Sequence, residues 1–318
     1  MSSSSKASII RIITKRSKND RFVGILDEGN RKRNLSQLLL ALISQERDNP
    51  FVKPKKVVYY SDPLNDDFAG TKISHKALPE NFKYVYKDPF SRFFSWFIYW
   101  LFAVPVLYFP VKWHFGIKVK GKRNMRSLRH KGVFFYCNHT QIIDSMLIQL
   151  YVAGPKRTYI VADQDATSIR GIRYLVQSLG CIPVPETPSE HKKFVECLRY
   201  RIKQKRGISI FPEAHIWPFS THIRPYKDDS FVYPCELEAP VVPVCVTYRK
   251  RKIRKKMAPA VTVHVGKPVY PDMSLDLASR RKKLRDHVYY FMLDTSAEDE
   301  NEEYIAYVRK PAEGEGEK

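Results

Sequence analysis

The chain has 318 residues, of which 43% are hydrophobic and 13% aromatic, and this content excludes global disorder and is enough for a sizeable core. Lysine and arginine number 55 against 33 acidic residues, a net charge of +22, so we expect an anionic partner such as nucleic acid or a membrane. The five cysteines are odd in number and lie at no metal-ligand spacing, which predicts reduced thiols, no metal site and a cytoplasmic environment.

Residues 1–88 form a first region whose role the sequence does not indicate. Within it, leucine and isoleucine at helical spacing predict an amphipathic helix over residues 35–47. An apolar strand is expected at residues 57–60, followed by a polar loop.

An uncharged and strongly aromatic run, FFSWFIYWLFAVPVLYFPV, occupies residues 93–111. As a helix it approaches the thickness of a bilayer core, and its prolines would bend it. We predict a membrane anchor over residues 89–113, either one kinked spanning helix or a re-entrant pair turning near Pro105; a buried core helix is the alternative. Basic residues flank both ends, which fits a re-entrant anchor and a catalytic domain on the cytoplasmic side of the membrane.

Residues 114–295 alternate short apolar strands with helical patterns. The expected strands are 132–137, 158–163, 181–184, 208–211, 241–248 and 260–265, and the expected helices are 144–152, 169–179, 190–205 and 274–293. This alternation predicts an α/β fold, with a central, largely parallel sheet flanked by helices. The acidic residues 296–318 are predicted to form a disordered tail.

A histidine and an aspartate follow the first strand of this domain, as Asn138-His139 and Asp144. If His139 ends the strand and Asp144 opens the next helix, the carboxylate can hold one imidazole nitrogen while the other accepts a proton from a substrate hydroxyl. A structural histidine is the alternative for this pair taken alone. A second strand ends at Phe211-Pro212-Glu213, which places Glu213 and His215 in a loop at a strand end, where α/β sites form.

In this order, NHTQIID (138–144), FPEAHI (211–216) and APVVPV (239–244) resemble the motifs of the glycerolipid acyltransferase family that includes 1-acylglycerol-3-phosphate acyltransferases. The resemblance covers roughly residues 114–270. It implies transfer of a fatty acyl group from acyl-CoA or acyl carrier protein to the sn-2 hydroxyl of 1-acylglycerol-3-phosphate, without cofactor or metal. It implies His139 as general base and Asp144 as its partner, with substrate-binding residues Asn138, Thr140, Glu213, Ala214 and His215.

Two departures from the family pattern concern the acceptor phosphate. The family's Gly-Thr-Arg is here Ala214-His215-Ile216, and Glu186 stands where a second arginine is expected. We predict that Arg224 and Lys227 replace these arginines as phosphate ligands, with a solvated surface role as the alternative for each.

Two other interpretations remain at this point. One is an acyltransferase for a hydroxyl acceptor that lacks phosphate; the other is a non-enzymatic basic membrane-binding protein. The basic run RKRKIRKK (249–256) is either a polar hairpin loop or a patch for anionic lipid heads. We expect membrane phospholipid and no nucleic acid as partner, because neither a recognition helix nor an aromatic sheet face accompanies the basic residues.

Overall fold

The computed structural model describes residues 56–69, 77–79, 81–168 and 173–310, apart from the side chains of Ala166 and Ser168. These residues belong to one compact unit, Lys53–Lys318. The helix predicted over residues 35–47 lies outside them.

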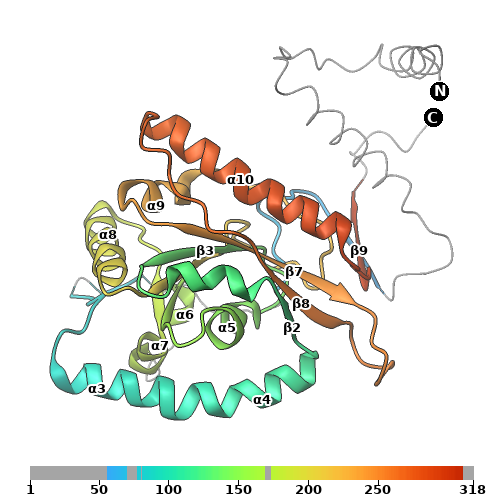
Figure 1. The fold of residues 1–318 in the computed structure, drawn as a ribbon, viewed down its shortest axis with the longest axis horizontal. Coiled ribbons are helices and arrows are strands. Elements are labelled where there is room, and N and C mark those ends of the chain that lie inside the picture. Colours follow the sequence, from blue (N-terminus) through green and yellow to red (C-terminus); the bar gives the residue numbers. More distant parts are fainter. Residues whose placement is uncertain (1–55, 70–76, 80, 169–172, 311–318) are drawn as a thin grey trace. The chain divides into compact units, whose positions relative to one another are not determined.

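A seven-stranded sheet forms the centre of this unit, in the strand order β2-β8-β7-β3-β6-β4-β5 (Figure 1). Strands β3 to β7 run parallel, β8 is antiparallel to β7, and β2 is parallel to β8. The strands are β2 (Lys118–Lys120), β3 (Val133–Cys137), β4 (Thr158–Ala162), β5 (Cys181–Pro183), β6 (Gly207–Ile210), β7 (Val241–Arg249) and β8 (Ala260–Val265). The predicted α/β fold with a largely parallel sheet is therefore confirmed.

Strand β3 lies in the middle of the sheet, with all five of its residues buried. Phe134 and Tyr136 pack into the core on one face, whereas Val133, Phe135 and Cys137 pack into the core on the other. A strand covered on both faces needs apolar residues at every position, which explains the unbroken run GVFFYC.

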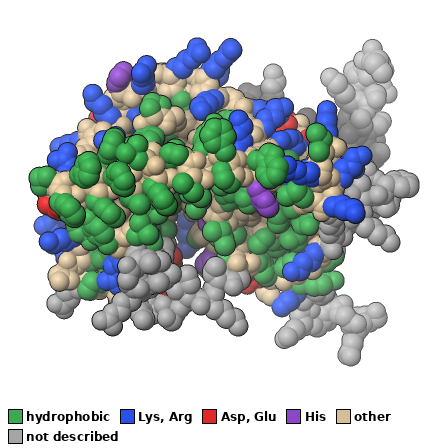
Figure 2. Space-filling view, turned by 90° about the horizontal axis from the view of Figure 1, so that it is seen from below, with side chains coloured by type: hydrophobic (Ala, Val, Ile, Leu, Met, Phe, Trp, Pro, Cys, Tyr) green, Lys and Arg blue, Asp and Glu red, His purple; other side chains and the backbone are tan. Residues whose placement is uncertain are grey.

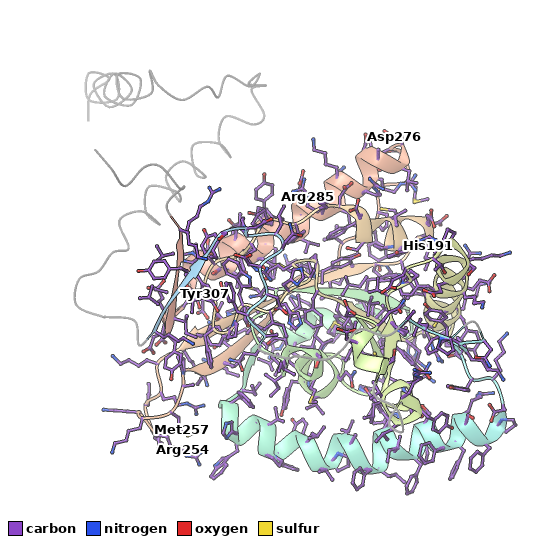
Figure 3. All side chains as sticks on the ribbon, turned by 180° about the vertical axis from the view of Figure 1, so that it is seen from behind. His191, Arg254, Met257, Asp276, Arg285 and Tyr307 are labelled. Carbon is purple, nitrogen blue, oxygen red and sulfur yellow. The ribbon has the colours of Figure 1, made fainter. Side chains whose placement is uncertain are left out.

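Helices cover both faces of the sheet (Figure 1). One side carries α8 (Pro188–Lys203), η4 (Asp229–Phe231), α9 (Val232–Glu236) and α10 (Leu277–Glu298). The other side carries η2 (Lys122–Leu128) and α5 (Asp144–Leu147), which continues as η3 (Ile148–Val152). Two short helices, α6 (Asp165–Ser168) and α7 (Arg173–Leu179), precede β5. Asp276, labelled in Figure 3, caps the N-terminus of α10, because its carboxylate accepts the N–H groups of Ala278 and Ser279 at 3.0 Å.

The aromatic run forms one continuous helical segment, consisting of α3 (Pro89–Phe97), the π-helical η1 (Ile98–Ala103) and α4 (Val104–Phe115) (Figure 1). Of the two alternatives for the anchor, the re-entrant pair turning near Pro105 is wrong, and the single helix agrees with this continuous segment. Pro105 falls in the first turn of α4, directly after the π-helical segment. There the N–H of Val104 donates to the carbonyl of Tyr99, and this wider bonding pattern accommodates the missing proline N–H without breaking the helix.

By length and composition, the 27-residue segment Pro89–Phe115 could cross a membrane, and 11% of its most apolar stretch is buried. One face packs on the domain through Val104, Leu107, Tyr108 and Val111. Figure 2 looks onto the opposite face, where hydrophobic side chains form a band with lysine and arginine around it. Its most exposed members are Phe90, Phe93, Phe109 and Trp113, at 63–76% exposure.

A small second sheet corrects the prediction of a disordered tail. Strand β9 (Ile305–Arg309) pairs in parallel with β1 (Lys56–Tyr60), the strand predicted at residues 57–60. The ring of Tyr307 stacks on Trp217 at a centroid distance of 4.7 Å, and its hydroxyl donates to the carbonyl of Pro218. These contacts order residues 296–310 despite their acidic composition; residues 311–318 lie outside the described part.

Candidate active site

The candidate site lies where β3 and β6 end, at the carboxyl edge of the parallel sheet. The segment Asn138–Gln141 leaves β3, and the loop that begins at Phe211 leaves β6. Backbone hydrogen bonds join the two loops: the N–H of Trp217 donates to the carbonyl of His139, and that of Phe219 to the carbonyl of Thr140. Parallel pairing of β3 with β6 thus brings together residues more than seventy positions apart in the sequence.

Asp144 holds the β3 loop in shape. It is the first residue of α5, and its side chain is 1% exposed. Its Oδ2 atom accepts the backbone N–H groups of Thr140 and Gln141 at 2.6 and 2.7 Å. The same oxygen lies 3.4 Å from Nδ1 of His139. One carboxylate therefore fixes the loop backbone and faces the imidazole that the loop carries.

His139 is held from two further directions. Its ring stacks on Phe211, with the centroids 4.2 Å apart and the planes inclined by 23°. Its backbone N–H donates to Oε2 of Glu213 at 3.2 Å. The side chain keeps 13% exposure, so a substrate hydroxyl can approach the imidazole. With Nδ1 facing Asp144, Nε2 is the nitrogen left for the reaction.

Glu213 and Arg224 form a buried ion pair under the site. Their side chains are 2% and 3% exposed. Arg224 Nη2 donates to Glu213 Oε2 at 3.2 Å, and the Arg224 backbone N–H donates to Oε1 at 3.1 Å. Burial raises the pKa of Glu213 and lowers the pKa of Arg224, so on each group desolvation outweighs the attraction of the partner.

This placement contradicts the prediction that Arg224 offers a fork to a phosphate. Besides Glu213, its guanidinium donates to the carbonyl of His215 and lies 4.9 Å from the ring of Trp217. The arginine is therefore enclosed by protein and shapes the loop after β6. Lys227 is exposed and does not join it. Arg224 and Lys227 are close in the sequence, and their spacing does not show that the first is buried and the second exposed.

Asn138 and Thr140, predicted as substrate-binding, have their polar atoms engaged with protein. The Asn138 amide accepts from the N–H of Val246 at 2.8 Å and donates to the carbonyl of Val246 at 3.0 Å, which ties the end of β3 to β7. The hydroxyl of Tyr248 donates to Thr140 Oγ1 at 2.6 Å. Both residues thus position the loop that carries His139.

Tyr248 and Phe211 were not singled out as site residues by the sequence analysis. Both stand at or just beyond the carboxyl ends of parallel strands, the edge where α/β sites form. An aromatic residue at such a strand end is the signal that could have identified them.

Ala214 explains one departure from the family pattern. It is exposed, with a backbone φ of 62°, in the left-handed region that favours glycine. The chain therefore keeps the turn that the family's glycine permits and accepts the strain of a Cβ atom there. His215, also predicted to bind substrate, contributes its carbonyl to Arg224.

The basic run 249–256 supports the end of α4. Arg251 donates to the carbonyl of His114 at 2.6 Å, and Arg254 lies 3.5 Å from the ring centroid of Trp113. Figure 3 shows Arg254 in this hairpin, beyond the end of α4. Within the described ranges, no group of three or more His, Cys, Asp or Glu side chains could hold a metal ion.

A histidine–carboxylate pair beside a strand-end loop can act as a general base on a hydroxyl group. Residues 116–247 match the family described as Acyltransferase, so the chain carries an acyltransferase domain. It is also similar to the crystal structure of the 1-acyl-sn-glycerophosphate (LPA) acyltransferase PlsC from Thermotoga maritima, at 18% identity and a TM-score of 0.48, over 67% of this chain and 89% of that chain. Comparison with curated protein sequences gave no match.

Proposed function

We propose that this protein transfers a fatty acyl group from acyl-CoA or acyl carrier protein to the sn-2 hydroxyl of 1-acylglycerol-3-phosphate, which gives phosphatidate for phospholipid biosynthesis. The observation that carries the proposal is the His139–Asp144 pair, held at the carboxyl edge of an acyltransferase domain. The Asn-His-x4-Asp spacing of residues 138–144 resembles the corresponding motif of the family.

In the proposed reaction, His139 acts on the acceptor hydroxyl. Nε2 takes the hydroxyl proton while the acceptor oxygen attacks the thioester carbonyl. Asp144 orients the ring through Nδ1 and stabilises the imidazolium that forms. A C–O ester bond forms, the C–S bond breaks, and the proton on Nε2 passes to the departing sulfur.

Direct transfer fits the state of the neighbouring cysteine. Cys137 immediately precedes the site loop and is 1% exposed. Burial raises its pKa well above the ordinary value, with the charge of Asp144 adding to the effect. Because the thiolate is the reactive form, this cysteine is unsuited to carry the acyl group as an intermediate.

An apolar cavity of about 240 Å³ beside α5 supports a lipid substrate. Val104 and Leu107 line it from the long helix, and Met146 and Leu150 from α5 and η3. The cavity borders α5, the helix that begins at Asp144, and its lining is apolar enough for a hydrocarbon chain, although neither His139 nor Asp144 lines it.

The long helix supports attachment to a membrane surface. One face packs along the domain, so the helix fits an orientation in the plane of the membrane, with its exposed aromatic face in the lipid. All five cysteines are free thiols, which suits a reducing compartment, and we place the catalytic domain on the cytoplasmic side.

The burial of Arg224 favours a second candidate, an acyltransferase whose acceptor lacks phosphate. Neither family arginine position is basic here, and the replacement predicted from the sequence is paired with Glu213. A phosphate monoester at the site needs cationic partners or several N–H donors.

An acyl-transfer assay on the full chain tests the proposal and separates the two acceptors. Acyl-CoA and acyl carrier protein are each offered with 1-acylglycerol-3-phosphate, lysophosphatidylcholine or monoacylglycerol. We expect phosphatidate as the main product, with loss of transfer in His139→Ala. Transfer to monoacylglycerol with none to 1-acylglycerol-3-phosphate would support the second candidate. Absence of transfer to every acceptor would overturn both.

A further inference from the structure

A second cavity, of about 500 Å³, opens at the amino edge of the sheet, the edge opposite the catalytic pair. Its walls come from α3 and η1, the beginnings of β4 and β6, the end of α8, and α7 with β5. Val133 at the beginning of β3 pairs with Gly207 at the beginning of β6, whereas His139 lies six residues further along. At about 3.3 Å per residue, the two sites are separated by roughly 20 Å.

Four arginines from four parts of the chain line this cavity. Arg157 and Arg206 immediately precede β4 and β6, whose first residues, Thr158 and Gly207, are paired neighbours. The other two come from helices: Arg92 lies on α3 and Arg201 in the last turn of α8. Only the folded sheet brings these four charges to one place.

The charge of this cavity is not compensated by the described residues. No aspartate or glutamate lines it, and none of its four arginines takes part in a salt bridge within the described ranges. Arg157 is 7% exposed, and burial lowers its pKa. Among described residues, the buried Nε atoms of Arg157, Arg201, Arg224 and Arg285 have no hydrogen-bond partner, but Arg224 and Arg285 each pair with a carboxylate, whereas Arg157 and Arg201 do not. Such groups are costly to bury unless an anion binds them.

The guanidinium groups of the buried Arg157 and the partly buried Arg201 are held by neighbouring groups. Arg157 Nη2 donates to Ser95 Oγ at 2.7 Å and to the carbonyl of Ser178 at 2.5 Å. The guanidinium carbons of Arg157 and Arg201 lie 5.0 and 4.1 Å from the ring centroid of Tyr159. Arginines anchored in this way are ordered in advance for a ligand with several oxygen atoms, such as a phosphate.

The mouth of the cavity adjoins the apolar face of the long helix. Phe93 and Trp96 line the cavity and are 63% and 48% exposed, and Trp100 lines it as well. Aromatic side chains of this kind prefer the level of the lipid headgroups. The position of the cavity beside this surface favours a membrane lipid over a soluble phosphate compound.

We propose that this cavity binds the phosphate headgroup of an anionic membrane phospholipid, at a site separate from the catalytic one. The arginines contact the phosphate oxygens, and the aromatic side chains of α3 and η1 contact the upper part of the lipid. Attraction to an anionic surface and burial of the helix in lipid then act at the same place on the molecule.

The test is a binding titration of the full chain with dihexanoyl phosphatidylglycerol, kept below its micelle concentration and followed by tryptophan fluorescence. Trp96 and Trp100 line the cavity and report on occupancy. Dihexanoyl phosphatidylcholine serves as the zwitterionic comparison. We expect saturable binding of the anionic lipid and at least about tenfold weaker binding in Arg201→Gln and Arg92→Gln, since each removes a charge-assisted contact.

Lys203→Gln is the matched control, because Lys203 is an exposed cation of the same helix that does not line the cavity. It should bind like the wild type. If Arg201→Gln fails to fold, Arg92→Gln on the exposed face still decides the result.

Equal weakening by Lys203→Gln would overturn the proposal in favour of general charge attraction. Equal affinity for both lipids, or unchanged binding in both arginine variants, would also overturn it. Displacement of the lipid by free CoA, with Arg201-dependent CoA binding, would assign the cavity to the acyl donor. All readouts are binding constants, so they remain interpretable whether or not the proposed acyl transfer is observed.

Discussion

Among the described residues, charged side chains have partners of opposite charge at one edge of the parallel sheet and lack them at the other. At the carboxyl edge, Glu213 forms an ion pair with Arg224 and Asp144 Oδ2 accepts backbone N–H groups, so each charge has a partner inside the protein even though Asp144 Oδ1 and Arg224 Nε and Nη1 make no hydrogen bond to described residues. At the amino edge, Arg157 and Arg201 face a cavity without a described carboxylate. We infer from this comparison that a charged side chain paired within the protein stabilises the shape of a site. A charged side chain without such a partner indicates a place where a ligand of opposite charge can bind.

The largest effect on activity is expected from substitution of His139, the proposed general base at the carboxyl edge. His139→Ala should lower kcat about 10²–10⁴-fold, because the general base is lost, while thermal unfolding stays close to that of the wild type. Steady-state kinetics on the preferred acceptor measure this change. His222→Ala, at a ring 64% exposed, is the control and should retain activity. Near-normal turnover of His139→Ala would disprove the mechanism.

Arg224→Met tests whether charge at the carboxyl edge is structural. Removal of one member of a buried pair leaves Glu213 uncompensated, so we expect the free energy of unfolding to fall by about 3–5 kcal/mol in chemical denaturation. The double variant Glu213→Gln/Arg224→Met should recover part of this loss.

Lys227→Met, at an exposed site, is the control for this pair and should change stability by no more than about 0.5 kcal/mol. A stable Arg224→Met variant with a raised KM for the acceptor alone would instead restore Arg224 as a substrate ligand.

The pH dependence of stability tests the effect of a buried charge at the amino edge, that of Lys156. Its ammonium donates to the carbonyls of Arg129, Lys131 and Lys205, and burial lowers its pKa to about 8. An unfolded lysine titrates near about 10.4, so between these values the unfolded chain binds more protons and stability rises with pH. The stability of the wild type relative to Lys156→Met should therefore grow from about pH 7 to 10. A decrease would mean that the three carbonyls favour the ammonium more than burial disfavours it.

The smallest effect is expected from backbone strain near the site. Ala214→Gly should raise the free energy of unfolding by about 0.5–1 kcal/mol, because glycine relieves the left-handed strain but adds freedom to the unfolded chain. Gly154 allows the reverse substitution, because it is a glycine in the left-handed region, at φ 66°, with open space where a Cβ atom would lie. Gly154→Ala should destabilise by about 1 kcal/mol. Changes of the same sign at both positions would contradict the strain argument.

Local patterns in the sequence predicted most of the regular structure. Apolar residues at helical spacing predicted α8 over residues 190–205, and the helix is found at Pro188–Lys203. The prediction missed the first two residues, where the Thr187 hydroxyl accepts the N–H of Glu190 and Pro188 suits the first helical turn. The sequence left open whether the aromatic run is one helix or turns near Pro105, because the π-helical segment before that proline depends on backbone bonds that residue types do not encode. The prediction failed at β9, whose order comes from pairing with a strand some 250 residues earlier.

The sequence by itself determined the α/β class, the strand-end positions of His139, Asp144 and Glu213, and the uncharged aromatic helix. These follow from local residue order, which sets hydrophobic periodicity and marks where strands end. Only the tertiary structure decided that Arg224 is an internal partner of Glu213 and that four distant arginines share one cavity. A side chain's electrostatic role depends on which charges the fold places beside it and on how much water it removes, and neither is a property of sequence spacing.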